Sequence, residues 1–135
     1  MVNPRKVYVI DTGLITACSR SIRPEWGRLL ENFVFMELRR RYPVVEYYKT
    51  GGGREVDFIV RETDGRYRLI QVTAEFSDKL TRERELSALS EAMNECGLKE
   101  ATVVTLNEEE TLESDDGRIR VLPAWLWVLL GEAQE

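Results

Sequence analysis

Two alternating runs joined by a turn, residues 54–60 and 67–73, limit the fold of this chain more than any other feature. Apolar and polar residues that alternate with period two are typical of strands that bury one face. Asp64–Gly65 between the runs predicts the turn of an antiparallel hairpin. The apolar face of the first strand would carry Val56, Phe58 and Val60. The opposite, polar face of the hairpin would bring together Asp57, Gln71 and Thr73.

The rest of the sequence predicts an α/β domain in which helices flank a mixed sheet. Further strands are expected at 6–10, 44–49, 101–106 and 118–122, and further helices at 25–41, 81–96 and 123–130. Because a helix separates the hairpin from the strand at 101–106, that strand can return parallel to the strand at 67–73. Glu108–Glu110 together with Asp115–Gly117 predict an acidic turn region. The alternating charges of Arg82–Glu85 predict a solvent-facing first helical turn, from which Arg82 or Arg84 could reach the site.

The helix at 25–41 is expected to be largely buried, because apolar residues cover most of its circumference. Its polar strip is narrow and consists of Arg28, Asn32 and Arg39. Glu31 lies outside that strip, among apolar neighbours, where a carboxylate needs a hydrogen-bond donor, a cation or a metal ion as its partner. A structural ion pair with an arginine and a functional carboxylate both remain open.

The composition excludes several kinds of chemistry. The chain contains no histidine, so catalysis by a Ser-His-Asp or Cys-His arrangement and zinc held by histidine are excluded. Hydrolysis would have to use carboxylates, lysines and a hard cation such as Mg²⁺. Cys18 and Cys96 have no metal-ligand spacing and are expected to be buried thiols of a reducing compartment. No secretory signal or membrane span is recognisable, so we expect a cytoplasmic protein.

The charge is unevenly distributed along the chain. The net charge is −5, although residues 1–60 are net basic and residues 61–135 net acidic. The acidic second half argues against a protein that coats nucleic acid, whereas the basic first half is compatible with a local phosphate-binding surface. The glycines 51–53 precede Arg54 and can either approach a phosphate or form a flexible turn. Candidate nucleic-acid contacts are Lys49, Arg54, Arg82 and Arg84.

Several motifs in a fixed order resemble a known family. They are Asn3–Tyr8, Asp11–Leu14, Gly27–Asn32, Tyr48–Phe58, Leu69–Thr73 and Pro123–Trp125. Together they resemble the PD-(D/E)xK nuclease-like superfamily, and within it the C-terminal domain of unknown function of archaeal and bacterial AAA-type ATPases. The resemblance implies an αβββαβ core with an extra N-terminal strand, a C-terminal strand and a short helix. It also implies that residues 1–135 form one domain, the C-terminal part of a longer ATPase.

The resemblance assigns a role to each residue of the polar face. Glu31 would be the helix carboxylate, Asp57 the principal metal ligand, Gln71 the acidic third-strand position and Thr73 the lysine position. Gln71 brings no charge, and Thr73 cannot orient water or stabilise a phosphate as lysine does. Lys49 is then the candidate substitute lysine, and Glu55 the candidate for the missing carboxylate. Mg²⁺ or Mn²⁺ would therefore bind weakly.

Three functions follow from this set of residues. The first is an accessory domain with a degenerate metal site that acts in DNA binding or regulation, inactive as an enzyme on its own. The second is an active metal-dependent DNA endonuclease, and the third is a module that docks the ATPase to a protein partner. We expect no nucleotide to bind this domain, because it has no phosphate-binding loop. The ATPase module would be a partner in cis or in trans, DNA and a second copy of the chain are further candidate partners, and no membrane is expected.

Overall fold

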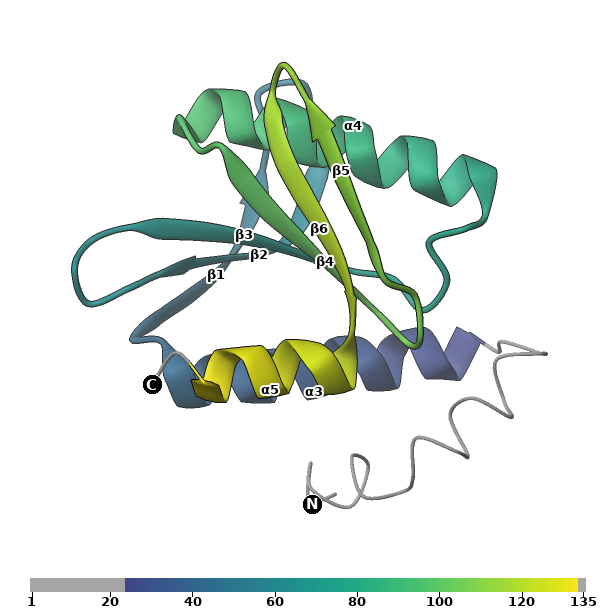
Figure 1. Cartoon of the computed structure of the whole chain (residues 1–135). Helices are drawn as coiled ribbons and strands as arrows, with labels where there is room; N and C mark the ends of the chain where they lie inside the picture. The colour runs from purple at the N-terminus through teal and green to yellow at the C-terminus, as the bar shows by residue number, and fades with distance from the viewer. Residues whose placement is uncertain (1–23, 134–135) are drawn as a thin grey trace.

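The computed structural model describes residues 24–133, which form three helices and six strands within that range (Figure 1). In chain order these elements are α3 (Pro24–Arg41), β1 (Val44–Lys49), β2 (Glu55–Arg61), β3 (Tyr67–Val72), α4 (Lys79–Cys96), β4 (Glu100–Thr105), β5 (Glu110–Ser114), β6 (Gly117–Pro123) and α5 (Ala124–Ala133). The predicted order from the long helix to the strand at 101–106 is confirmed. The expected strand at 6–10 and Cys18 lie outside the described residues.

One mixed sheet contains all six described strands, in the order β1-β2-β3-β4-β6-β5. The strands β1, β2 and β3 form an antiparallel meander, and β4 lies parallel to β3 as predicted. The strand β6 is parallel to β4, and β5 closes the edge antiparallel to β6. The sheet therefore contains an antiparallel part, β1-β2-β3, and a parallel part, β3-β4-β6, which meet at β3.

The expected turn region at Glu108–Glu110 and Asp115–Gly117 is confirmed in part, because residues 108–109 and 115–116 lie outside the strands, but the strand β5 between them was missed. In β5, Glu110 and Leu112 are half-buried while Thr111, Glu113 and Ser114 are exposed, which suits an edge strand. Two acids of this strand are paired with cations across the surface, Glu110 with Arg82 and Glu113 with Arg118.

Helices cover both faces of the sheet, α4 on one face and α3 together with α5 on the other (Figure 1). Each face has its own apolar cluster: Leu30, Val34 and Trp127 belong to the α3/α5 cluster, and Leu89 and Val103 to the α4 cluster. The helix α4 begins at the N-cap Asp78, whose carboxylate accepts the Thr81 N–H, and ends at Gly97 in a left-handed conformation. No described helix is long and apolar enough to cross a membrane.

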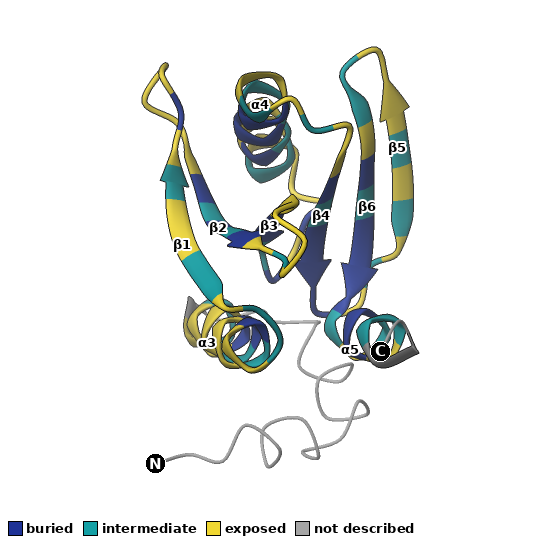
Figure 2. Ribbon diagram, turned by 90° about the vertical axis from the view of Figure 1, so that its left-hand side faces the viewer, coloured by how far each residue is buried: buried dark blue, intermediate teal, exposed yellow. Residues whose placement is uncertain are grey.

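The helix α3 is buried on one side only, so the expectation of a largely buried helix was wrong. Leu30, Val34 and Leu38 are buried against the sheet. On its other side the apolar side chains of Leu29, Phe35 and Met36 are 36–41% exposed. Figure 2 shows this exposed surface of α3 pointing away from the strands. An apolar helix circumference therefore did not mean burial on all sides.

A β-bulge in β2 breaks the alternation that the sequence predicted. Between Glu46↔Ile59 and Tyr48↔Val56 the register shifts, so β2 has one extra residue at Asp57–Phe58. Phe58 and Val60 consequently pack in the α3/α5 cluster, whereas Val56 packs in the α4 cluster. The shared apolar face expected for Val56, Phe58 and Val60 was wrong. The bulge places Asp57 at the point where the strand changes faces.

Candidate functional site

Asp57 and Gln71 lie where β2 and β3 separate. The backbone pairing of the two strands ends at Phe58↔Ile70. Beyond it, the Asp57 N–H donates to Gln71 Oε1 at 2.7 Å, and the Val72 N–H donates to Asp57 Oδ2 at 2.9 Å. Two side chains thus replace the missing ladder hydrogen bonds, each accepting from the backbone of the opposite strand. The predicted proximity of Asp57 and Gln71 is confirmed.

Both polar atoms of the Gln71 amide bond protein groups. Its Nε2 donates to the carbonyl oxygen of Glu55 at 3.3 Å and to Glu85 Oε2, while its Oε1 accepts from Asp57 as described above. Only 4% of Gln71 is exposed, and Glu85 is also buried, at 8%. Both donor hydrogens of the amide are therefore used, and its oxygen accepts one of the two hydrogen bonds that it can accept. Gln71 therefore holds β2, β3 and α4 together.

Glu85 is a member of this centre that the sequence interpretation missed. The expectation that Arg82–Glu85 all face solvent was wrong for Glu85, whose other carboxylate oxygen accepts from the neighbouring Arg84 at 3.3 Å. A signal was present in the sequence. Glu85 precedes Ala88 and Leu89 by three and four residues, which places it on the same buried face of α4.

Burial and nearby acids shift the protonation of this centre. Removal from water raises the pKa of Asp57 to about 6, and the charges of Glu31, Glu85 and Glu55 act in the same direction, against the hydrogen bond from Val72. Burial likewise raises the pKa of Glu85, partly offset by Gln71 and Arg84. Both shifts favour the protonated carboxyl groups, so ionising Asp57 and Glu85 costs free energy in the folded state.

Glu31 reaches this region from α3, but it is an exposed residue, so the expected apolar surroundings were wrong. Its charge still contributes to the raised pKa of Asp57, which places Glu31 on the side of the sheet from which it can act on that carboxylate. Because water solvates Glu31, it needs no ion pair and no metal ion to be stable there.

The remaining predicted residues surround the centre without completing it. The Thr73 hydroxyl donates to the Glu75 carbonyl oxygen at 3.2 Å, within its own loop. Lys49 and Glu55 are exposed and lie opposite each other on β1 and β2. No ion pair or hydrogen bond joins Lys49 to Asp57 among residues 24–133. The nominated substitute lysine is therefore beside Glu55 and not bound to Asp57.

The glycine turn before Arg54 is fixed to α4. Glu91 accepts the Gly52 N–H at 2.7 Å and pairs with Arg54 at 2.6 Å. Glu95 accepts the Gly51 N–H at 2.8 Å and the Tyr48 hydroxyl at 2.6 Å. A Cβ on Gly52 would lie 2.5 Å from Glu91 Oε1, so a larger residue would force the Glu91 side chain to move. The backbone donors that could have met a phosphate already bind carboxylates.

Arg82 and Arg84 are also engaged in ion pairs, whereas the fourth candidate contact, Lys49, has none among the described residues. Arg82 forms a bidentate pair with Glu110, at 2.8 and 2.7 Å, and lies over the ring of Phe76. Arg84 bonds Glu85 at 3.3 Å. Each would have to exchange a carboxylate for a phosphate in order to bind DNA.

The donor set does not fit a firmly held Mg²⁺ or Mn²⁺. Within the described part of the chain, no three acidic or thiol side chains come together in a way that could hold a metal ion. Asp57 and Glu85 each already accept hydrogen bonds from protein groups, and every polar atom of the Gln71 amide bonds the protein. Mg²⁺ is held by one or two carboxylates with octahedral geometry completed by water, so binding here would require these hydrogen bonds to rearrange.

The fold and this centre define an α/β domain with a half-buried carboxylate at a bulge of its mixed sheet. Over residues 26–127 the chain matches a family described as Domain of unknown function (DUF4143), and it belongs to that family.

Two further similarities were found. The chain is 34% identical over 133 residues to an uncharacterized protein of Methanocaldococcus jannaschii, MJ1544. The matched region covers 92% of this chain and 29% of that protein. The fold of the present chain is similar to that of a chain in the half-complex from a tetradecameric assembly of Thermococcus gammatolerans McrB AAA+ hexamers with bound McrC. That similarity has a TM-score of 0.50 and 11% identity, and it covers 72% of this chain and 27% of the other. The chain thus spans less than a third of either relative.

Proposed function

We propose that this chain is a nuclease-like accessory domain of an AAA-type ATPase, with a degenerate metal site, that acts in DNA binding or regulation. The observation that carries the proposal is the amide of Gln71. At the third-strand position, where the PD-(D/E)xK resemblance calls for an acidic ligand, every polar atom of this side chain bonds Asp57, Glu55 or Glu85. A metal ion bound at this position would have to break these hydrogen bonds.

The association with an ATPase is supported by two independent similarities. The order and spacing of the sequence motifs resemble the domain that follows the ATPase module in AAA-type ATPases. The fold is similar to a chain of an assembly that contains McrB AAA+ hexamers. The domain supplies no phosphate-binding loop in its sequence, so in this proposal ATP is bound and hydrolysed by the partner module.

The chemistry of phosphodiester hydrolysis argues against cleavage by this domain alone. Charge builds up at the phosphate in the transition state and has to be met by a metal ion or a fixed cation. Thr73 provides no cation, and Lys49 is exposed beside Glu55. Removal of one such electrostatic contact costs on the order of 10²–10³ in rate, and here both are weakened.

A plasmid-nicking assay tests this proposal. The purified chain is incubated with supercoiled DNA and Mg²⁺ or Mn²⁺, beside Asp57→Ala and Lys49→Ala variants. We expect no metal-dependent nicking above that of the Asp57→Ala variant. Nicking by the wild-type chain that Asp57→Ala abolishes would establish an active endonuclease instead, and its loss in Lys49→Ala would identify the substitute lysine.

A second candidate function, docking to a protein, is favoured by the exposed apolar side chains of the two helices on one face. Leu29, Phe35 and Met36 of α3, and Trp125 and Leu129 of α5, are between 36% and 49% exposed. Salt dependence separates the two functions. Affinity for DNA that falls steeply with salt would indicate phosphate contacts, whereas self-association in light scattering that persists at high salt would indicate an apolar interface.

A further inference from the structure

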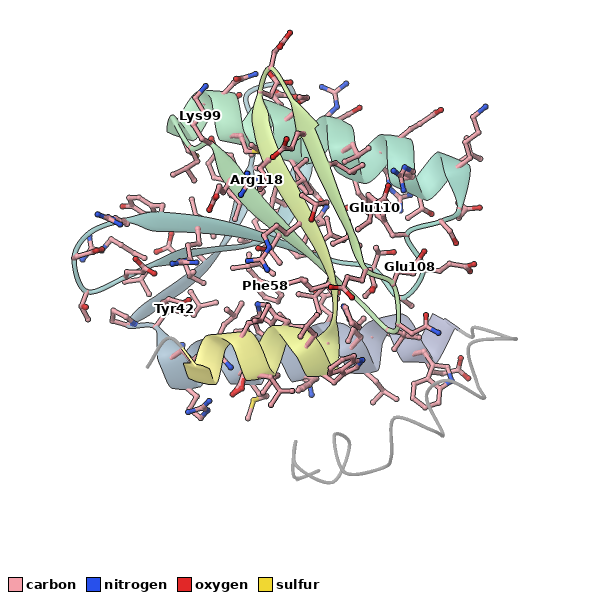
Figure 3. All side chains as sticks on the ribbon, in the orientation of Figure 1. Tyr42, Phe58, Lys99, Glu108, Glu110 and Arg118 are labelled. Carbon is pink, nitrogen blue, oxygen red and sulfur yellow. The ribbon has the colours of Figure 1, made fainter. Side chains whose placement is uncertain are left out.

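A cavity of about 280 Å³ lies apart from the Asp57 centre. It is bordered by the first residues of β3, the segment 98–102 that leads into β4, Arg120 of β6, the end of α3, and Trp127 of α5. Figure 3 labels two of its lining residues, Tyr42 at the end of α3 and Lys99 ahead of β4. Neither Asp57 nor Gln71 nor Glu85 lines it. The cavity is therefore a separate candidate for a binding site.

The charged lining of the cavity is predominantly basic. Its charged residues are the cations Arg66, Arg68, Lys99 and Arg120 and the acids Glu62 and Glu100. Arg68 is neutralised by Glu62 at 2.6 Å, and Arg66 pairs at 3.4 Å with Asp64 near the hairpin tip. Neither Arg120 nor Lys99 has an ion pair or side-chain hydrogen bond among the residues that the structure describes. Two cations of the lining are thus free to meet an anion.

The position of Arg120 in the sheet explains why it has no acidic partner. Its register neighbours are Thr102 on β4 and Thr111 on β5, both uncharged. The acids one step along those strands, Glu100 and Glu113, lie opposite Arg118 and bond it at 3.9 and 2.8 Å. Arg118 therefore pairs with both carboxylates. Arg120 is half-buried, and its guanidinium has no ion pair among the described residues. An unpaired, partly buried guanidinium gains most from a ligand that accepts several of its N–H donors.

The other lining side chains indicate what such a ligand carries beside its anionic group. Tyr67 lies on the hairpin side and Tyr42 at the end of α3, so tyrosine rings border the cavity from two elements. Trp127 is 9% exposed and has the Arg41 guanidinium over its ring, so it closes the cavity as a core residue. The Thr102 hydroxyl lies beside Arg120 in the register and adds a polar group. Flat aromatic borders suit a planar ring by stacking. The volume admits a ligand of no more than about one nucleotide, since drug-sized pockets begin near 300 Å³.

We propose that this cavity binds a nucleoside 5′-phosphate, with Arg120 and Lys99 on the phosphate and the tyrosine rings beside the base. The chain has no phosphate-binding loop, which argues against a nucleoside triphosphate, but one phosphate group needs only the side-chain cations that are present. The same chemistry occurs in a free mononucleotide and at the 5′-phosphorylated end of a DNA strand. The proposal is independent of the function proposed for the Asp57 centre.

Titration calorimetry with the full chain tests this site. The probes are AMP, adenosine, inorganic phosphate, and a short single-stranded DNA with or without a 5′-phosphate. We expect saturable binding of AMP, of the 5′-phosphorylated strand, or of both, with adenosine and inorganic phosphate each at least about tenfold weaker, because each lacks one half of the contacts. Preference for the strand would identify a DNA end as the ligand, and preference for AMP a free nucleotide.

Matched variants assign the binding to the cavity. Arg120→Gln should weaken it at least about tenfold, and Lys99→Gln, at an exposed position, should weaken it in a chain that still folds. Arg54→Gln is the control, because Arg54 lies outside the cavity lining and pairs with Glu91. Asp57→Asn should leave binding unchanged, so a failure here is distinct from nicking activity at the other centre. Absence of saturation by every phosphate probe at about 1 mM, or equal binding by wild type and Arg120→Gln, would overturn the proposal.

Discussion

The Asp57 centre and the Arg120 cavity are both polar regions of one sheet, and they differ in how their polar groups are used. At the centre, the amide of Gln71 and the turn before Arg54 bond carboxylates and backbone groups of the same chain. At the cavity, Arg118 takes the available acids and Arg120 has no partner within the described residues. Satisfied polar groups stabilise a fold, whereas an unsatisfied cation in a cavity is available to a ligand.

This difference teaches that charge in the sequence is a poor guide to the binding surface. Of the four candidate DNA contacts, Arg54, Arg82 and Arg84 each pair with a glutamate, and only Lys49 has no ion pair among the described residues. The strand that contains Arg120 gave no sequence signal of a binding site. Arg120 has no acid opposite it because the sheet register places threonines there. The following predictions test the contrast, starting with the largest expected effect.

Replacing Gln71 by Leu should have the largest effect on stability. The substitution leaves the Asp57 N–H without its partner and removes the hydrogen bond to Glu85 Oε2, so Glu85 keeps only its contact with Arg84. Unsatisfied buried groups cost about 1–3 kcal/mol each. We expect the free energy of unfolding in urea to fall by about 3 kcal/mol. Thr73→Ala is the control, because Thr73 loses only a local bond. A loss for Gln71→Leu no greater than that of Thr73→Ala would mean that the amide does not hold the strands and α4 together.

Asp57 should make the stability depend on pH. Its folded pKa of about 6 lies above its ordinary value of about 4, so the folded state binds the proton more tightly. This group therefore costs nothing below pH 4 and destabilises the fold progressively as pH rises from about 4 to about 6. The full shift corresponds to about 3 kcal/mol at most, and partial solvation reduces it.

The Asp57→Asn variant checks this dependence. Because an asparagine can still accept the Val72 N–H through its Oδ1, we expect it to unfold at a higher urea concentration than wild type at pH 8 and at an equal one near pH 4. Equal differences at both pH values would contradict the raised pKa of Asp57.

The hydrogen bond and ion pair that join the glycine turn to Glu91 of α4 should contribute less to stability. Glu91→Ala removes the bonds to Gly52 and Arg54 at the surface, which should cost about 1 kcal/mol. Glu83→Ala is the matched control on the same helix, because Glu83 is exposed and has no partner among the described residues. If the two variants unfold at the same urea concentration, the turn is not fixed by Glu91.

The smallest effect is expected for the engaged arginines in nucleotide binding. Arg54→Gln and Arg82→Gln should leave the affinity for AMP or the phosphorylated strand within about twofold of wild type, because surface charges away from the cavity act only through screened long-range attraction. A weakening by either variant as large as that by Arg120→Gln would erase the distinction between the two regions.

The sequence predicted the elements of the fold better than the environment of the centre. Alternation located β2 and β3, and the intervening helix indicated that β4 returns parallel to β3. The bulge at Asp57–Phe58 could not be predicted, because nothing in an alternating run marks the residue at which a partner strand slips. Glu31 was placed by a helical wheel that assumed burial all round, and the side of α3 that carries Leu29 and Phe35 is exposed.

The centre itself was predicted in part. Asp57 and Gln71 do meet, because antiparallel pairing determines which residues are opposite each other. Glu85 was missed because charge alternation was weighed above helical spacing, although Ala88 and Leu89 follow at three and four residues. The free guanidinium of Arg120 depends on contacts between strands far apart in the sequence, which local patterns do not contain.

The most direct test of the central claim is an anomalous difference map from a crystal soaked in Mn²⁺. The account predicts no Mn²⁺ peak among Glu31, Asp57 and Gln71, with the Gln71 amide still bonded to Glu85 and Asp57. A peak coordinated by Asp57, with the Gln71 amide released from Glu85, would contradict it and establish a working metal site.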